Sequence, residues 1–141
     1  MDPRVRKAIE TGFENEPFVR TIGLRLTELR DGYSAVEMVH EPARHDNLFR
    51  RAHGGAIYAL IDEAFEIAAQ SDGSIAVALN VNVTYVASPE PGSLLRAEAK
   101  RISQSKKTAN FDIWVMADDG KLIATCRALA FRTGKPLQIE E

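Results

Sequence analysis

The residues best suited to chemistry lie in one stretch, from Asn47 to Gln70, which reads NLFRRAHGGAIYALIDEAFEIAAQ. The pair Gly54-Gly55 precedes a long apolar segment and can leave backbone N–H groups uncovered at a helix start, where partial positive charge collects. Asp62 lies within that segment, where a carboxylate is unfavourable unless it is paired, hydrated or used. Donors for a developing negative charge, together with a carboxylate base or nucleophile, are the two halves of an acyl-transfer site.

The spacing of these groups predicts the assembly. Gly55 and Asp62 are seven residues apart, so on one helix they share a face but lie about 10 Å apart along the axis. An oxyanion donor and a base must both come within about 3 Å of one reacting atom. We therefore expect a homodimer whose active site lies across the interface, with Gly55 of one subunit facing Asp62 of another.

Two further glutamates follow Asp62 on the same segment. Glu66 lies one turn later, so repulsion between like charges should raise one pKa and make a better general base near neutral pH. One alternative is that Glu63 and Glu66 simply face solvent or cap the edge of the dimer. For Asp62 the alternative is a buried side chain hydrogen-bonded to a strand.

The rest of the chain predicts the elements that position this stretch. Asp31-Gly32 and Asp119-Gly120 indicate tight turns between strands. One helix, apolar over most of its circumference, against many strands is typical of an α+β fold in which an antiparallel sheet wraps the helix. We expect a single domain over 1–141 with its core at about 21–132. The expected elements are a short helix at 4–13, a loop at 15–17, strands at 21–29 and 33–39, a loop at 42–51, the long helix at 56–69, strands at 75–85, 94–102, 109–117 and 122–131, and a frayed tail after 133.

The strand after the long helix shows a clean alternation. One face would carry Ile75, Val77, Leu79, Val81, Val83 and Tyr85, and the other Ala78, Asn80, Asn82 and Thr84.

Composition narrows the class of protein. The chain has 141 residues, of which 45% are hydrophobic and 27% charged, as in ordinary globular domains. A formal net charge of -2 argues against a general attraction to nucleic acid. Cys126 is the single cysteine, which fits a reducing compartment and a buried, unreactive side chain. The first 17 residues hold no apolar signal core and no run is long enough to span a membrane, so we expect a cytoplasmic protein without membrane contact.

The same residues resemble a known family. The segment HGGAIYALIDEAF, preceded by Asn47 and followed by LNVNVTYVASPEPGSLLRAEA, is similar to the hotdog-fold acyl-CoA thioesterases of the phenylacetate-degradation (PaaI-like) branch. The aspartate lies nine residues after His53 and the asparagine six residues before it. The DDGKLIAT hairpin also fits, and the resemblance covers roughly 21–131.

The resemblance implies roles for these residues. Asp62 would be the general base or nucleophile, Gly55 N–H would polarise the thioester carbonyl, and Asn47 would hold the carbonyl or the water. His53 and Gly54 would shape the binding loop. The substrate would be an acyl-CoA thioester with no separate cofactor, and the assembly a homodimer or homotetramer.

Two positions depart from the family pattern. Arg50 occupies a position that is glycine in many relatives, and Ala78 one that is serine or threonine in some. A water-positioning role would then fall to Asn80 or Asn82, and we take Asn82 as a candidate substrate-binding residue.

Local positive charge should bind the coenzyme A phosphates despite the acidic total. The candidates are Arg51, Lys106 and Lys107, with Lys100-Arg101 and Arg50 as further basic positions. Each pair is equally explained as an ordinary solvated edge. The acyl group should lie against Tyr58, Phe49 or Phe65, although such aromatics are usually core.

Other functions fit less well. His40, His45 and His53 do not have the spacing of a helical ligand set, so we expect no metal. No G-x-S-x-G turn is present for a serine hydrolase. A hotdog hydratase or dehydratase using His53 is the second enzyme hypothesis. A dimeric module that binds acyl-CoA or an acyl-carrier protein without turnover is the non-catalytic one.

Overall fold

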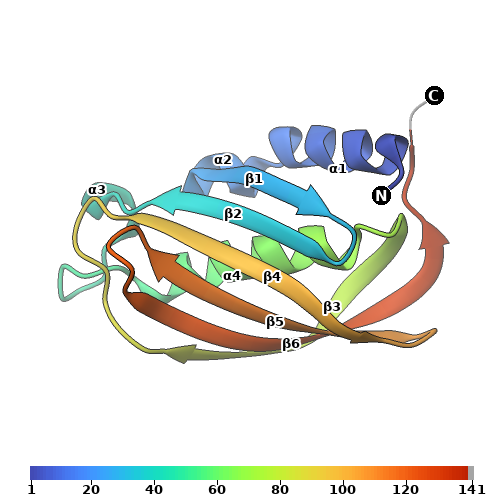
Figure 1. Ribbon diagram of the computed structural model, residues 1–141. Helices are drawn as coiled ribbons and strands as arrows, with labels where there is room; N and C mark the ends of the chain where they lie inside the picture. The colour runs from blue at the N-terminus through green and yellow to red at the C-terminus, as the bar shows by residue number, and fades with distance from the viewer. Residues whose placement is uncertain (140–141) are drawn as a thin grey trace.

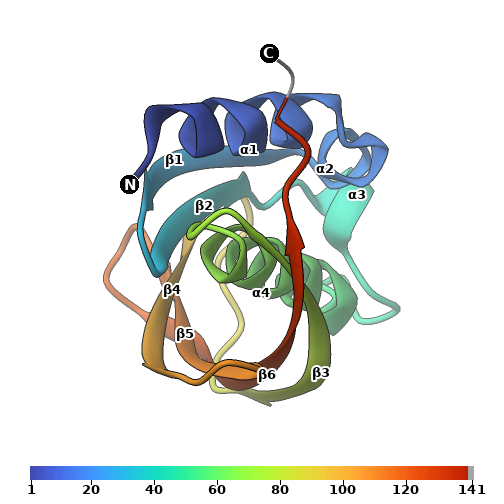
Figure 2. The same ribbon diagram turned by 90° about the vertical axis from the view of Figure 1, so that its right-hand side faces the viewer.

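A computed structural model describes residues 1–139. Its six strands form one antiparallel sheet in the order β1-β2-β4-β5-β6-β3, and this sheet curls around the long helix α4 (Figures 1 and 2). The predicted α+β architecture is therefore confirmed. The elements are α1 (Pro3–Asn15), α2 (Pro17–Ile22), β1 (Leu24–Arg30), β2 (Tyr33–Val39), α3 (Pro42–His45), α4 (Gly54–Ala69), β3 (Ser74–Tyr85), β4 (Leu94–Gln104), β5 (Thr108–Ala117) and β6 (Leu122–Pro136).

The central helix is buried on most of its circumference because its sequence is apolar almost all round. Leu60, Ile61 and Ala64 are fully buried, and Phe65 packs edge-on against Phe111 of β5, with ring centroids 5.4 Å apart. A narrow stripe remains at least partly accessible, and it carries Gly55, Tyr58, Asp62 and Glu66.

The N-terminal helix lies across the sheet edge formed by β1 (Figure 2). Its buried residues Val5, Ile9 and Phe13 recur every four positions, as expected for an amphipathic helix that covers a core. No helix among residues 1–139 is long and apolar enough to cross a membrane.

Three local predictions were wrong. The segment expected as a loop at 42–51 begins with the one-turn helix α3 (Pro42–His45). Thr21 and Ile22 belong to the short helix α2 rather than to a strand, because Pro17 begins that helix and Gly23, with φ 82°, ends it in the left-handed region. Six residues are too few to show a helical period. The tail does not fray at Thr133, because β6 continues to Pro136 opposite Ser74.

The predicted alternation along β3 was also wrong. The pairing with β6 shifts between Ala78 and Asn80, which leaves Leu79 as the extra residue of a β-bulge. Ala78 lies opposite the buried Ala130 and so faces α4, whereas Asn80 lies opposite the less buried Leu129. The bulge therefore places Ala78 and Asn80 on opposite faces of the sheet.

Candidate active site

The start of α4 is held by His53, Gly54 and Tyr85. His53 is the N-cap, and its Nδ1 accepts a hydrogen bond from Gly55 N–H at 2.8 Å. Tyr85, at the end of β3, donates its hydroxyl to the Gly54 carbonyl at 3.0 Å. A Cβ on Gly54 would lie 3.2 Å from the Tyr85 ring, so glycine permits this close approach. Within residues 1–139, Gly54 N–H has no acceptor, which leaves one free donor at the helix start.

Asp62 lies two turns further on, in the accessible stripe. Its carboxylate accepts no hydrogen bond and forms no ion pair within residues 1–139, so the alternative of a structural hydrogen bond to a strand does not hold. Burial, and secondarily the charge of Glu16, raises the pKa of Asp62. A half-buried carboxylate that supports no neighbour is suited to accepting a proton.

The two following glutamates differ from each other. Glu63 is buried, and burial together with Glu66 and Glu16 raises the pKa of Glu63 to about 9. Glu66 as a whole is exposed, but its carboxyl group is packed closely enough for burial to raise its pKa. The charges of Glu16 and Asp62 add to this effect, and the pKa of Glu66 rises to about 7. The predicted repulsion between Asp62 and Glu66 is therefore present, while the alternative that both glutamates face solvent fails for Glu63.

The loop before the helix is organised by Asn47. Its Oδ1 accepts hydrogen bonds from Phe49 N–H at 2.9 Å and Arg51 N–H at 3.2 Å. Arg50 adopts a left-handed φ of 59° at the tip of the loop. The Asn47 side-chain oxygen therefore holds the loop, while its Nδ2 has no acceptor within the described chain and is left to donate.

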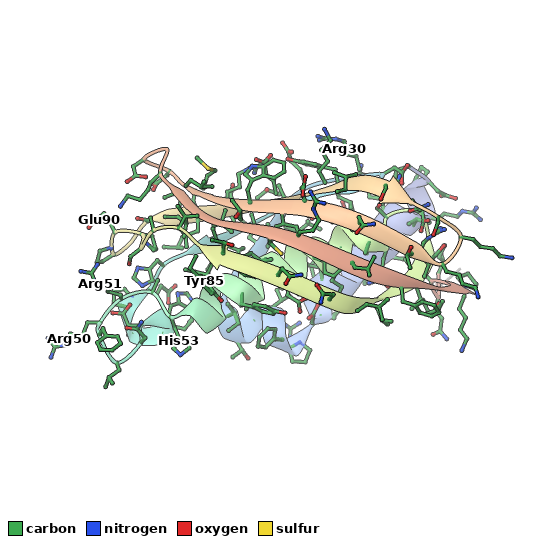
Figure 3. The ribbon with its side chains drawn as sticks, turned by 90° about the horizontal axis from the view of Figure 1, so that it is seen from below. Arg30, Arg50, Arg51, His53, Tyr85 and Glu90 are labelled. Atoms are coloured by element: carbon green, nitrogen blue, oxygen red, sulfur yellow. The ribbon has the colours of Figure 1, made fainter. Side chains whose placement is uncertain are left out.

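The predicted site residues do not all come together in one chain. Arg50, Arg51 and His53 gather at one end of the molecule (Figure 3). Lys106 lies at the other end of α4, because Arg132 contacts both the Lys106 carbonyl, at 3.5 Å, and the carboxylate of Asp72, which follows α4. A helix of 16 residues is about 24 Å long, so Lys106 and its neighbour Lys107 are remote from Gly54-Gly55 of their own chain.

Asn82 is likewise turned away from Asp62. It lies opposite Arg127 on β6, and that position alternates with the buried Cys126 and Ala128. Its amide donates to Asn80. The expectation that Asn80 and Asn82 share the face of Ala78 is therefore wrong, and the Leu79 bulge is the reason.

The histidines do not form a metal site. His40 donates to Asp46 at 2.7 Å, His45 donates to the Ile22 carbonyl at 2.7 Å, and His53 caps α4. Within residues 1–139 none of them belongs to a group of three potential metal ligands.

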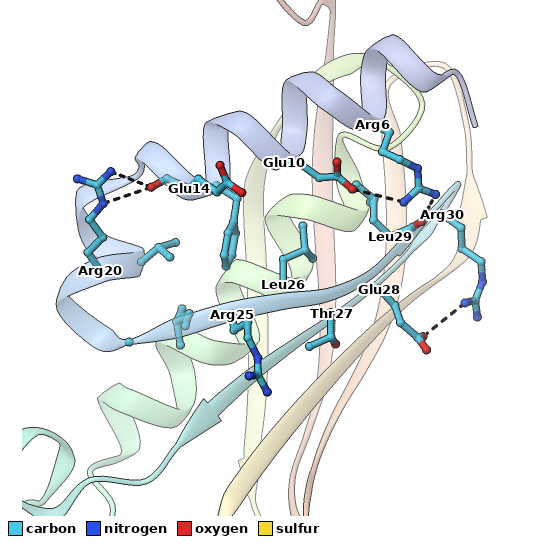
Figure 4. A pocket seen from close by; sticks show the side chains of 14 residues that line it. Arg6, Glu10, Glu14, Arg20, Arg25, Leu26, Thr27, Glu28, Leu29 and Arg30 are labelled. Carbon is cyan, nitrogen blue, oxygen red and sulfur yellow. Dashed lines mark hydrogen bonds and ion pairs between the residues drawn. The ribbon is translucent and has the colours of Figure 1, made fainter.

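A pocket of about 800 Å³ lies elsewhere, between α1 and β1 (Figure 4). Several of its charged groups are paired, as in Arg6–Glu10 and Arg30–Glu28, both at 3.6 Å, and Arg25 pairs with Glu37 at 2.6 Å. These pairs leave it poorly suited to acid–base chemistry. A smaller pocket of about 240 Å³ adjoins Asp62 and is lined by Phe65, Ala78 and Ala130 among others.

Comparison with known proteins identifies the family. Residues 49–124 match the model of the thioesterase superfamily. The chain belongs to the thioesterase superfamily. Among curated proteins it is 34% identical over 123 residues to a putative esterase of Archaeoglobus fulgidus, covering 87% of this chain and 79% of that one. It is 29% identical over 122 residues to the acyl-coenzyme A thioesterase PaaI of Escherichia coli, covering 86% of each.

The solved structures agree with this assignment. The E. coli PaaI protein from the phenylacetic acid degradation operon superposes with a TM-score of 0.89 and 26% identity, over 94% of this chain and 96% of that one. The antiparallel sheet wrapped around a central helix is therefore the hotdog fold, as the sequence predicted.

Some residues near Asp62 and the start of α4 carry no recognisable signal in the sequence. Tyr85 is 31 positions from Gly54, so only the fold brings its hydroxyl to the helix start. Cys126 is buried as predicted. Burial is the main cause that raises the pKa of its thiol to about 11, and the charge of Asp62 is a further cause. Glu16, at the junction of α1 and α2, is close enough for its charge to raise the pKa of Asp62.

Proposed function

We propose that this chain is an acyl-CoA thioesterase that hydrolyses a small aromatic or short- to medium-chain acyl-CoA, with Asp62 as general base or nucleophile. The observation that carries the proposal is the state of Asp62. This carboxylate is half-buried on the central helix, its pKa is raised by burial, and it forms no hydrogen bond or ion pair within residues 1–139. Membership of the thioesterase superfamily and the likeness to E. coli PaaI support the same reaction.

In the simplest form of this reaction, water attacks the thioester carbonyl carbon while Asp62 removes its proton. The carbonyl oxygen becomes an oxyanion, the C–S bond then breaks, and Asp62 returns the proton to the departing coenzyme A sulfur. The products are a free acid and coenzyme A. Direct attack by the Asp62 carboxylate would pass through an anhydride that water then hydrolyses to the same products.

Backbone donors at the start of α4 would stabilise the oxyanion. Gly55 N–H is taken up by His53 Nδ1 at 2.8 Å, so the exposed imidazole must move aside as the thioester carbonyl takes its place. Gly54 N–H, which has no acceptor within the described residues, would be the second donor. In this proposal His53 supports the helix start in the free chain and transfers no proton in the reaction, in contrast to the hydratase alternative.

Asp62 and Gly55 would come from different subunits. They lie on one continuous helix, about 10 Å apart along its axis, so one chain cannot bring both to one carbonyl. The surface available for a second copy is the outer edge of β3. This edge has no partner strand within the described chain. Val77, Leu79 and Tyr85 are each about half exposed along it. We infer an antiparallel homodimer, and two such dimers in a homotetramer.

Coenzyme A would enter at the end of the molecule that holds the basic loop. Arg50 and Arg51 form no ion pair within residues 1–139, and they line a pocket of about 260 Å³ with Phe49 and the segment Ser88–Pro91. Guanidinium groups there suit phosphate. In an antiparallel dimer the C-terminal end of the partner's α4 would lie near this loop. The pair Lys106-Lys107 of the partner subunit would then help to bind the coenzyme A phosphates. The small pocket beside Asp62 and Ala78 would receive the acyl group.

The test is release of free thiol from a panel of aryl- and aliphatic-CoA thioesters, with wild type and Asp62→Asn compared at equal concentration. Hydrolysis by wild type that is lost in the variant supports the proposal, and the preferred substrate gives the acyl class. If no thioester is hydrolysed while coenzyme A analogues still bind, the chain is a binding module. The lack of a hydroxyl at Ala78 is the feature that favours this second outcome.

A further inference from the structure

Three glutamates from separate parts of the chain converge beside α4. Glu16 joins α1 to α2, while Glu63 and Glu66 lie on α4. One carboxylate oxygen from each lies within 4.8 Å of those of the other two. None of the three forms an ion pair with a basic side chain within residues 1–139. Their negative charges therefore have no protein counter-charge in the described chain.

Glu63 provides a second and separate observation. It is only 3% exposed, and its Oε1 is buried with no hydrogen-bond partner among the described residues. Buried carboxylates in folded proteins are normally paired, hydrogen-bonded or bound to a metal. The carboxyl group of Glu63 that carries this oxygen is the one that lies within 4.8 Å of Glu16 and Glu66.

A pocket adjoins the cluster. It has a volume of about 370 Å³, and its lining includes Glu16, Glu66, Asn15 and Gln70. This is room for several water molecules, with polar side chains to orient them. The cluster is also open to solvent on one side, because Glu66 is exposed.

We propose that Glu16, Glu63 and Glu66 bind one hard divalent cation, with Ca²⁺ the best match. Calcium–oxygen distances of about 2.3–2.6 Å allow two oxygens on one ion to be at most about 5 Å apart, and the 4.8 Å spacing satisfies this limit. A set of carboxylate oxygens, completed by water, suits calcium, magnesium or manganese rather than zinc or copper. The histidines considered from the sequence take no part in this site.

The bound ion would fasten the N-terminal helices to the central helix. Glu16 is the only ligand outside α4, so occupancy links the α1–α2 junction to the turn after Asp62. The role is structural, and no step of the proposed hydrolysis uses the ion. Without it, burial and the neighbouring charges of Glu66 and Glu16, which raise the pKa of Glu63 to about 9, would favour bound protons in the cluster. The competing explanation is therefore a proton-sharing cluster, and the two make different predictions.

The experiment is isothermal titration of CaCl₂, MnCl₂ and MgCl₂ into the full chain after treatment with EDTA and buffer exchange, at pH 8 in two buffers of different ionisation enthalpy. We expect one ion per chain, a rise in Tm on addition of the ion, and a heat that depends on the buffer because binding releases protons. Glu63→Gln and Glu16→Gln should weaken binding at least tenfold. Glu14→Gln, an exposed glutamate of the same segment, is the matched control and should bind as wild type does.

Absence of binding heat and of any Tm shift with all three ions at millimolar concentration would overturn the proposal and leave the proton-sharing cluster. Binding that is equal in wild type and both site variants would also overturn it, because the ion would then lie elsewhere. If Glu63→Gln fails to fold, Glu16→Gln decides the result on its own, since Glu16 lies outside the buried core. The readout does not depend on thioesterase activity.

Discussion

Replacing Asp62 by asparagine should separate catalysis from stability. A general base contributes about 10²- to 10⁴-fold to a rate, so the amide should lower kcat by that factor, equivalent to about 3–5 kcal/mol of transition-state stabilisation. The fold should lose nothing, because the Asp62 carboxylate accepts no hydrogen bond and forms no ion pair within residues 1–139. Burial raises the pKa of this carboxyl, which means that its ionised form is disfavoured in the folded state. A neutral amide removes that penalty, and Tm should be unchanged or higher.

The assay follows thiol release under single-turnover and steady-state conditions, with Tm measured on the same preparation. Asp112→Asn is the control, because that carboxylate lies on the outer face of the sheet, paired with Arg127 at 2.6 Å, and its loss should leave kcat within a few-fold of wild type. The reasoning is refuted if Asp62→Asn keeps most of its turnover. It is also refuted if Tm falls by more than about 4 °C, which in a chain of this size corresponds to about 1 kcal/mol of folding stability and would indicate a structural role.

Three further outcomes follow from the contacts. His53→Ala should lower the free energy of unfolding by about 1 kcal/mol, as loss of an N-cap does, and change kcat by tenfold at most. A loss of kcat as large as that of Asp62→Asn would instead make His53 a proton carrier. Leu79→Lys should place a charge on the open edge of β3 and prevent dimer formation. We expect a monomer by sedimentation that is folded by circular dichroism and has no turnover. An active dimer would contradict the proposed interface. Burial alone would raise the pKa of Asp72, but hydrogen bonds from Ser74 and Arg132 outweigh it and lower the pKa. The contact therefore stabilises the fold above the usual aspartate pKa of about 3.9 and is lost as the pH falls through the lower folded value. Asp72→Asn should reduce the free energy of unfolding near neutral pH by about 1 kcal/mol and flatten its acid dependence in urea titrations, and an unchanged dependence would exclude this contact as the cause.

The sequence predicted the helix and strand order well because the signals were long. The apolar segment after Gly54-Gly55 could only be a covered helix, and the strands were separated by turn signals such as Asp119-Gly120. The short helix α2 was missed because its six residues give no period, and Ile22 continued the apparent alternation of the next strand. Local patterns of that length do not distinguish a helical turn from the start of a strand.

The site was predicted where it depends on positions along one helix, and missed where it depends on pairing between distant strands. Gly55 and Asp62 could be placed relative to each other from helical geometry alone. Asn82 was assigned to the wrong face, because the bulge at Leu79 leaves no mark in a perfectly alternating sequence. Tyr85 and Glu16 meet α4 only through the tertiary fold, so no spacing in the sequence indicates them.

The extra residue in β3 also determines which substitutions the strand can accept. Before the bulge, Ala76 and Ala78 face the helix, and after it Val81 and Val83 do. Positions intolerant of large or charged side chains should therefore be even-numbered in the first half of the strand and odd-numbered in the second. Deleting Leu79 would remove only the extra residue, and Ala76, Ala78, Val81 and Val83 would then alternate regularly while all still face the helix. A deletion of Leu79 should thus be better tolerated than a deletion at any other position of the strand, because only the latter would turn one set of inward side chains outward.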